Sequence, residues 1–180
     1  MKRSILLIAT IISWCAVYLS VPLPAIAQEE TKARESNCCT IRYSNDAYLH
    51  TFTLRIGGFT YTSRGLDDNP SNVRTRVDEI MERVQATLDM YPSDLHISIL
   101  LYPDHQSMEK IFRRFTLTGN TPLAFYSNKT KSIYVNVADI TGGVLAHEMA
   151  HAVINFYFEV PPPAKMQEIL AQYVDLHIWD

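Results

Sequence analysis

The stretch HEMAH, residues 147–151, lies within residues 140–158, where apolar side chains recur at helical spacing. An α-helix turns by about 100° per residue, so His147 and His151 are expected on one face, one turn apart. Two imidazole nitrogens at this spacing can hold one zinc ion, and Glu148 at the rim of the same face can reach a water molecule on that ion. The spacing therefore predicts a helix that carries two metal ligands and a general base.

The opposite face of this predicted helix is apolar, as expected for a helix that packs against a core. It consists of Leu145, Met149, Ala152, Val153 and Phe156. The alternative interpretation is an amphipathic helix that bears two surface histidines. Because a catalytic zinc ion usually has three protein ligands, the two interpretations differ in whether the chain supplies a third.

A third ligand is not found at the position that would extend the histidine pattern. Six residues after His151 the sequence has Tyr157 and not histidine. A carboxylate from a later helix is the remaining choice. The last predicted helix, residues 164–178, offers Glu168 and Asp175 on one face.

Two motifs together resemble the gluzincin family of zinc metallopeptidases. They are HEMAH at residues 147–151 and, after sixteen intervening residues, EILAQY at residues 168–173. The second motif is similar to the E-G-x-A-x-Y motif of the aminopeptidase-like branch, with Ile169 in place of the glycine. The short chain is similar to the minimal gluzincins, which keep little beyond the catalytic core.

The resemblance implies a ligand set and a catalytic group. His147, His151 and Glu168 would bind one Zn²⁺ per chain, and Glu148 would be the general base. The resemblance also implies that the strand before the zinc helix, residues 132–137, lies near the substrate cleft.

The same helix offers residues that could support the site. Gln172 stands where the thermolysin-like branch has a carboxylate that orients a ligand histidine, and Asp175 could serve instead. Tyr173 and His177 are candidates for stabilising the oxyanion of the transition state. On an ideal helix both lie on the opposite face from Glu168, which favours a role in packing.

The activity implied is hydrolysis of peptide bonds in a peptide or protein substrate. The alternative is a binding domain of the same fold that is latent or catalytically silent, with or without zinc. The oligomeric state is not indicated by the sequence.

The N-terminus predicts export. Lys2 and Arg3 precede an apolar run at residues 5–21, and A-I-A at residues 25–27 has the form of a cleavage site. Residues 1–27 are therefore interpreted as a signal peptide, with a retained membrane anchor as the alternative. The product would be secreted or periplasmic.

Residues 28–180 retain 14 basic and 19 acidic side chains, a net charge of −5. This balance gives no electrostatic basis for binding nucleic acid. A chain of this length is expected to form one domain with one core.

The predicted fold is α+β, a small mixed sheet of about four to five strands packed with helices, followed by the zinc helix and the C-terminal helix. A flexible lead-in is expected at residues 28–37. Strands are predicted at 41–43, 48–56, 59–62, 95–102, 123–127 and 132–137, and helices at 73–88, 106–115, 140–158 and 164–178. Residues 48–56 and 59–62 are expected to form a hairpin, and the strand at 95–102 is expected to be central.

The segment 28–180 contains only two cysteines, the adjacent Cys38 and Cys39. They could form a vicinal disulfide, pair with another molecule or stay reduced. We expect the two cysteines to be exposed near the N-terminus and to have no catalytic importance. A redox role is the less favoured hypothesis.

Overall fold

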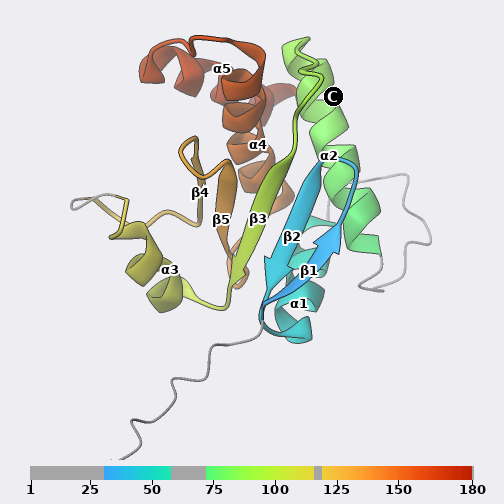
Figure 1. Ribbon diagram of the computed structural model, residues 1–180, viewed down its shortest axis with the longest axis vertical. Coiled ribbons are helices and arrows are strands. Elements are labelled where there is room, and N and C mark those ends of the chain that lie inside the picture. The colour runs from blue at the N-terminus through green and yellow to red at the C-terminus, as the bar shows by residue number, and fades with distance from the viewer. Residues whose placement is uncertain (1–30, 58–71, 116–118, 180) are drawn as a thin grey trace, which may run out of the picture.

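The computed structural model describes residues 31–57, 72–115 and 119–179. Within these ranges five strands form one mixed sheet in the order β1-β2-β3-β5-β4 (Figure 1). The strands are β1 (Lys32–Glu35), β2 (Cys39–Tyr43), β3 (Ile97–Tyr102), β4 (Ala124–Ser127) and β5 (Ser132–Asn136). Strands β2, β3 and β5 are parallel, and β1 and β4 are antiparallel edge strands.

The described ranges also contain five helices. They are α1 (Asp46–Ile56), α2 (Val73–Leu88), α3 (His105–Phe112), α4 (Gly142–Tyr157) and α5 (Ala164–His177). The main core joins buried residues of α1, α2, α4 and α5 to one face of the sheet. Helix α3 lies against the other face, next to β3 and β5 (Figure 1), and its buried Met108 is outside the main core.

The central strand shows how the sheet separates these two sides. Ile97, Ile99 and Leu101 of β3 are buried in the main core, whereas Leu100 and Tyr102 are partly exposed on the other face. Alternation of this kind is expected because successive side chains of a strand point to opposite faces. The structure confirms the predicted α+β class and the central place of this strand.

The predicted hairpin is wrong in its first strand, because residues 46–56 form helix α1. The side chain of Asn45 caps the helix by accepting a hydrogen bond of 2.9 Å from the N–H of Ala47. The residues of α1 that are buried have the spacing of a helix face, namely Leu49, Phe52, Thr53 and Ile56. This burial outweighs the strand preference of the β-branched and aromatic residues. The second predicted strand, residues 59–62, lies outside the described residues.

The expected flexible lead-in is also shorter than predicted. Residues 32–35 form β1, which pairs with β2. Cys38 and Cys39 are joined by a disulfide and are buried, contrary to the expected exposure. The carboxylate of Asp78 on α2 accepts hydrogen bonds from the N–H groups of Asn37 and Cys38, at 3.2 and 3.1 Å. These hydrogen bonds join the segment that carries the disulfide to α2, next to the start of β2.

The remaining predicted elements are confirmed within a few residues at each end. Helix α4 is capped by Thr141, whose hydroxyl accepts a hydrogen bond from the N–H of Val144 at 3.3 Å. No helix within the described ranges has the length and apolar character needed to cross a membrane. The predicted signal peptide, residues 1–27, lies outside the described residues.

Candidate metal centre

Helix α4 presents the two predicted ligand histidines side by side. The ring centroids of His147 and His151 are 5.0 Å apart. Only 20% and 18% of their side chains are exposed, so both rings lie in a sheltered position. The opposite side of α4 is buried, with Leu145, Met149 and Val153 fully covered. This confirms the predicted helix, in which the face opposite the histidines is apolar and packs against the core.

The turn after α4 is fixed by a chain of hydrogen bonds that the sequence analysis did not find. The side-chain amide of Asn155 donates to the carbonyl oxygen of His151 at 2.7 Å and to Oε1 of Gln167 at 2.8 Å. Gln167 donates in turn to the carbonyl oxygen of Pro162 at 2.7 Å. These contacts join the end of α4 to the first turn of α5, and Glu168 follows directly. The signal for Asn155 in the sequence is its position four residues after His151, which places both side chains on the same face of the helix.

Glu168 of α5 reaches both histidines. Its two carboxylate oxygens lie 3.4 Å from Nε2 of His147 and 3.5 Å from Nε2 of His151. One ligand atom from each of the three residues lies within 4.8 Å of the others. The three side chains are therefore close enough to bind one metal ion, in an arrangement consistent with HExxH followed by a glutamate.

Asp175 contacts the other ring nitrogen of His147 and lines the same side of the site. Its Oδ2 lies 2.9 Å from Nδ1 of His147, so this ring nitrogen can donate to the carboxylate. A histidine whose Nδ1–H is held in this way keeps Nε2 available as a metal ligand. Gln172, the other candidate for this role, is exposed like Asp175, but the hydrogen bond with His147 is formed by Asp175.

The electrostatics of the site favour a neutral histidine. Burial lowers the pKa of His151, and the neighbouring His147 lowers it further. The negative charges of Glu168 and Asp175 and a hydrogen bond with the side chain of Gln167 act in the opposite direction. A neutral imidazole is the form that binds metal, so the lowered pKa suits a ligand.

Glu148 lies between α4 and the edge strand β4. Its Oε2 accepts a hydrogen bond of 2.7 Å from the backbone N–H of Tyr126. Burial raises its pKa from 4.5 to about 7, against the opposing effects of this hydrogen bond and of His147. The charges of Glu168 and Asp175 add to the rise. A carboxyl group with such a pKa can exchange a proton near neutral pH.

A hollow of about 390 Å³ opens beside His147 and Glu148. Its apolar wall is formed by Pro122, Leu123, Ala124 and Val144. The strand beside the site is therefore β4, not the strand at residues 132–137 as expected. The reason is topological, because β5 is hydrogen-bonded on both edges, to β3 and to β4.

Two other predicted residues lie together on α5. The rings of Tyr173 and His177 are 4.4 Å apart, and Tyr173 is about half exposed. Neither lines the hollow beside Glu148 in the described part of the chain. Ile169, which stands where the similar motif has a glycine, is also half exposed, and the contact of Glu168 with the histidines forms without a glycine there.

The described residues thus provide a candidate metal-binding triad, a partly buried carboxyl group next to it and a cleft with an apolar wall. Comparison with protein-family models, with curated proteins and with solved structures found no match to this chain.

Proposed function

We propose that this protein is a zinc-dependent peptidase of the gluzincin type. The observation that carries the proposal is that one ligand atom from each of His147, His151 and Glu168 lies within 4.8 Å of the others. The two oxygens of Glu168 lie 3.4 and 3.5 Å from Nε2 of the first and the second histidine, respectively. Tetrahedral zinc with bonds of 2.0–2.1 Å would place its ligand atoms about 3.3–3.4 Å apart. Two histidines and one glutamate are also a common ligand set of catalytic zinc.

A zinc ion at this site would supply a Lewis acid that lowers the pKa of water and polarises a carbonyl group. Glu148 follows His147 directly on α4 and would accept the proton of the attacking water and then pass it to the leaving amine. Asp175 would keep Nε2 of His147 in the ligating position through its hydrogen bond to Nδ1. Each of these roles falls to a side chain whose position is fixed by α4 or α5.

The edge strand supports a peptide as the substrate. The N–H of Tyr126 points away from β5 towards Glu148. Because hydrogen-bond direction alternates along a strand, the backbone groups of Ala124 also point away from β5. An extended peptide could pair with this edge next to the cleft, and such pairing gives affinity through the main chain.

A second candidate function is a zinc-binding domain without efficient turnover. It is favoured by the placement of Tyr173 and His177, which do not line the described cleft as donors to an oxyanion. In that case the site would bind metal and a peptide but would leave the peptide intact.

Metal analysis combined with a peptide library tests the proposal. We expect about one zinc per chain, cleavage of library peptides, and loss of cleavage on addition of a chelator. Glu148→Gln should abolish cleavage and retain zinc, whereas the exposed Glu159→Gln should change neither. Zinc bound without cleavage would support the binding domain, and the absence of zinc binding would refute both.

We also propose that the protein is exported and that residues 1–27 are removed. The support is the charged start, the apolar run and the A-I-A site in the sequence. N-terminal sequencing of the protein from the outside of the cell should begin at Gln28. A chain that retains Met1 in a membrane fraction would support the anchor instead.

A further inference from the structure

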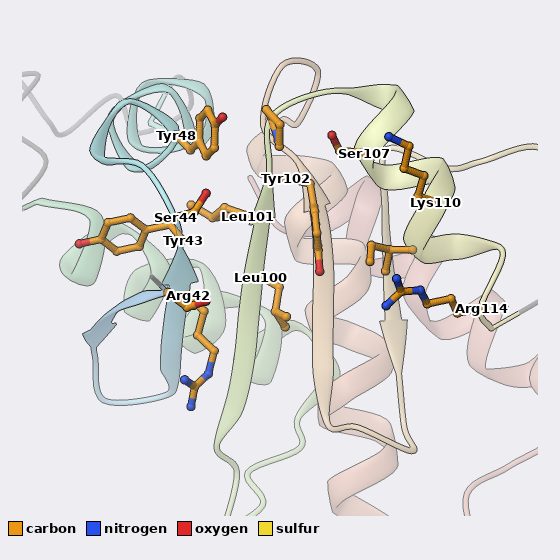
Figure 2. Close-up of a pocket in the computed structure, with 13 residues that line it drawn as sticks. Arg42, Tyr43, Ser44, Tyr48, Leu100, Leu101, Tyr102, Ser107, Lys110 and Arg114 are labelled. Carbon is orange, nitrogen blue, oxygen red and sulfur yellow. The ribbon is translucent and has the colours of Figure 1, made fainter. Parts of the chain in front are cut away.

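A second hollow, of about 510 Å³, lies between the ends of β2 and β3 and helix α3 (Figure 2). We call it the α3 pocket. It opens at the carboxyl ends of two parallel strands, where ligand sites are frequent in open sheets. Its volume is within the range of pockets that hold small organic molecules.

Three cationic side chains surround the α3 pocket. Figure 2 shows Arg42 of β2 on one side, and Lys110 and Arg114 near α3 on the other. No aspartate or glutamate lines the pocket, and no described carboxylate forms a salt bridge with any of the three. The whole chain carries a net charge of −3, so a cluster of three cations without salt-bridge partners among the described residues runs against its general charge.

The carboxylate of Asp104, which interacts with Lys110, is engaged in capping α3. Asp104 caps α3 by accepting a hydrogen bond of 2.7 Å from the N–H of Ser107. This hydrogen bond lowers the pKa of Asp104, and Lys110 contributes to the lowering. The capping carboxylate therefore faces the helix end and does not line the pocket.

The floor between the cations is apolar and aromatic. Leu100 and Tyr102 point away from the main core of the protein, and the ring of Tyr102 stacks on that of Tyr134 at 6.3 Å. Burial raises the pKa of Tyr102, and Tyr134 adds to the rise, whereas the positive charge of Arg114 lowers it. Arg114 is thus close enough to act on the floor of the pocket.

We propose that the α3 pocket binds a small organic anion, in which a carboxylate or phosphate group is attached to an apolar or aromatic body. The cations would pair with the anionic group, and arginine is suited to both carboxylate and phosphate. Leu100 and Tyr102 would contact the body of the ligand. The pocket shares no lining residue with the cleft at the metal centre, so this proposal stands independently of the peptidase function.

Calorimetric titration of the purified full-length chain tests the proposal with four matched probes. Phenyl phosphate and phenylacetate carry the two anionic groups, 2-phenylethylamine carries a cation, and 2-phenylethanol is neutral. We expect one or both anions to bind and the other two probes not to bind. Arg42→Gln and Arg114→Gln should each weaken the binding by about tenfold, as expected for the loss of one hydrogen bond to a charged group.

Arg113→Gln is the matched control, because it removes the same charge one residue away. Arg113 is paired with Glu109 and does not line the pocket. Binding of only phenyl phosphate or only phenylacetate would support the proposal and identify the anionic group. Equal binding of the neutral probe, unchanged affinity in both arginine variants, or an equal loss in Arg113→Gln would overturn it. An anion that binds at the metal centre and not in the α3 pocket would give this unchanged affinity, so the two arginine variants distinguish the two sites.

Discussion

Glu148 should make the metal-free protein less stable as the pH rises. Burial raises the pKa of this carboxyl group from 4.5 to about 7. A carboxyl group whose pKa is higher in the folded state binds its proton more tightly there than in the unfolded state. Its contribution to stability is therefore fully present below the pKa of the unfolded state, and it is lost as the pH rises through the pKa of the folded state. Between about pH 5 and about pH 8 the loss amounts to about 2–3 kcal/mol.

Substitution by glutamine isolates this contribution. Glu148→Gln retains an oxygen that can accept the hydrogen bond from Tyr126, but it cannot ionise. Relative to wild type, the variant should therefore gain about 2–3 kcal/mol in the free energy of unfolding over this pH range. For a chain of this size the gain corresponds to about 5–10 °C in Tm.

Thermal unfolding after removal of metal, followed by circular dichroism at several pH values, measures this difference. The exposed Glu159→Gln serves as control and should stay within about 0.5 kcal/mol of wild type. Added zinc should reduce the difference between wild type and Glu148→Gln, because a nearby cation stabilises the carboxylate. Parallel pH profiles of wild type and Glu148→Gln without metal would refute the burial of Glu148 beside β4.

Three further predictions address the ligands and the fold. Glu168→Ala should abolish tight zinc binding in calorimetry, because it removes the only carboxylate in the described triad; retained affinity would contradict its role as ligand. Asp175→Asn should weaken zinc binding or reduce activity by about 10–100-fold, whereas Gln172→Ala should not, and equal effects would contradict the hydrogen bond to the ring. Phe52→Ala should lower the free energy of unfolding by about 3–5 kcal/mol in urea, because Phe52 is fully buried on α1. Leu54→Ala, on the exposed side of the same helix, should cost far less, and similar costs would argue against this helix face.

The parts of the site that lie within a single helix could be predicted from the sequence. The placement of His147 and His151 on one face depends only on helix geometry over five residues, and the structure confirms it. The glutamate helix was found through its motif, and Glu168 lies next to both histidines. The sequence could not choose between Gln172 and Asp175 as the partner of His147, because both lie near the same face of α5. The packing of α5 on α4 decides that choice in favour of Asp175.

Other features depended on contacts between distant segments. Residues 46–56 carry both a strand pattern and a helical pattern, and burial of one face against the core selects the helix. Strand β4 lies at the edge of the sheet, and this position brings the N–H of Tyr126 to Glu148. The order of the strands cannot be predicted from the pattern of side chains along β4.

The sequence by itself determined the helix that bears the histidines, the helix that bears the glutamate and the mixed α+β class, because each is encoded by the periodicity of neighbouring residues. Tertiary structure alone decided which carboxylate supports His147, which strand borders the cleft, and that Arg42 and Arg114, 72 positions apart, line one pocket. The physical reason is that periodicity fixes the direction of a side chain on its own element. What that side chain meets depends on how the elements pack and on the order of the strands.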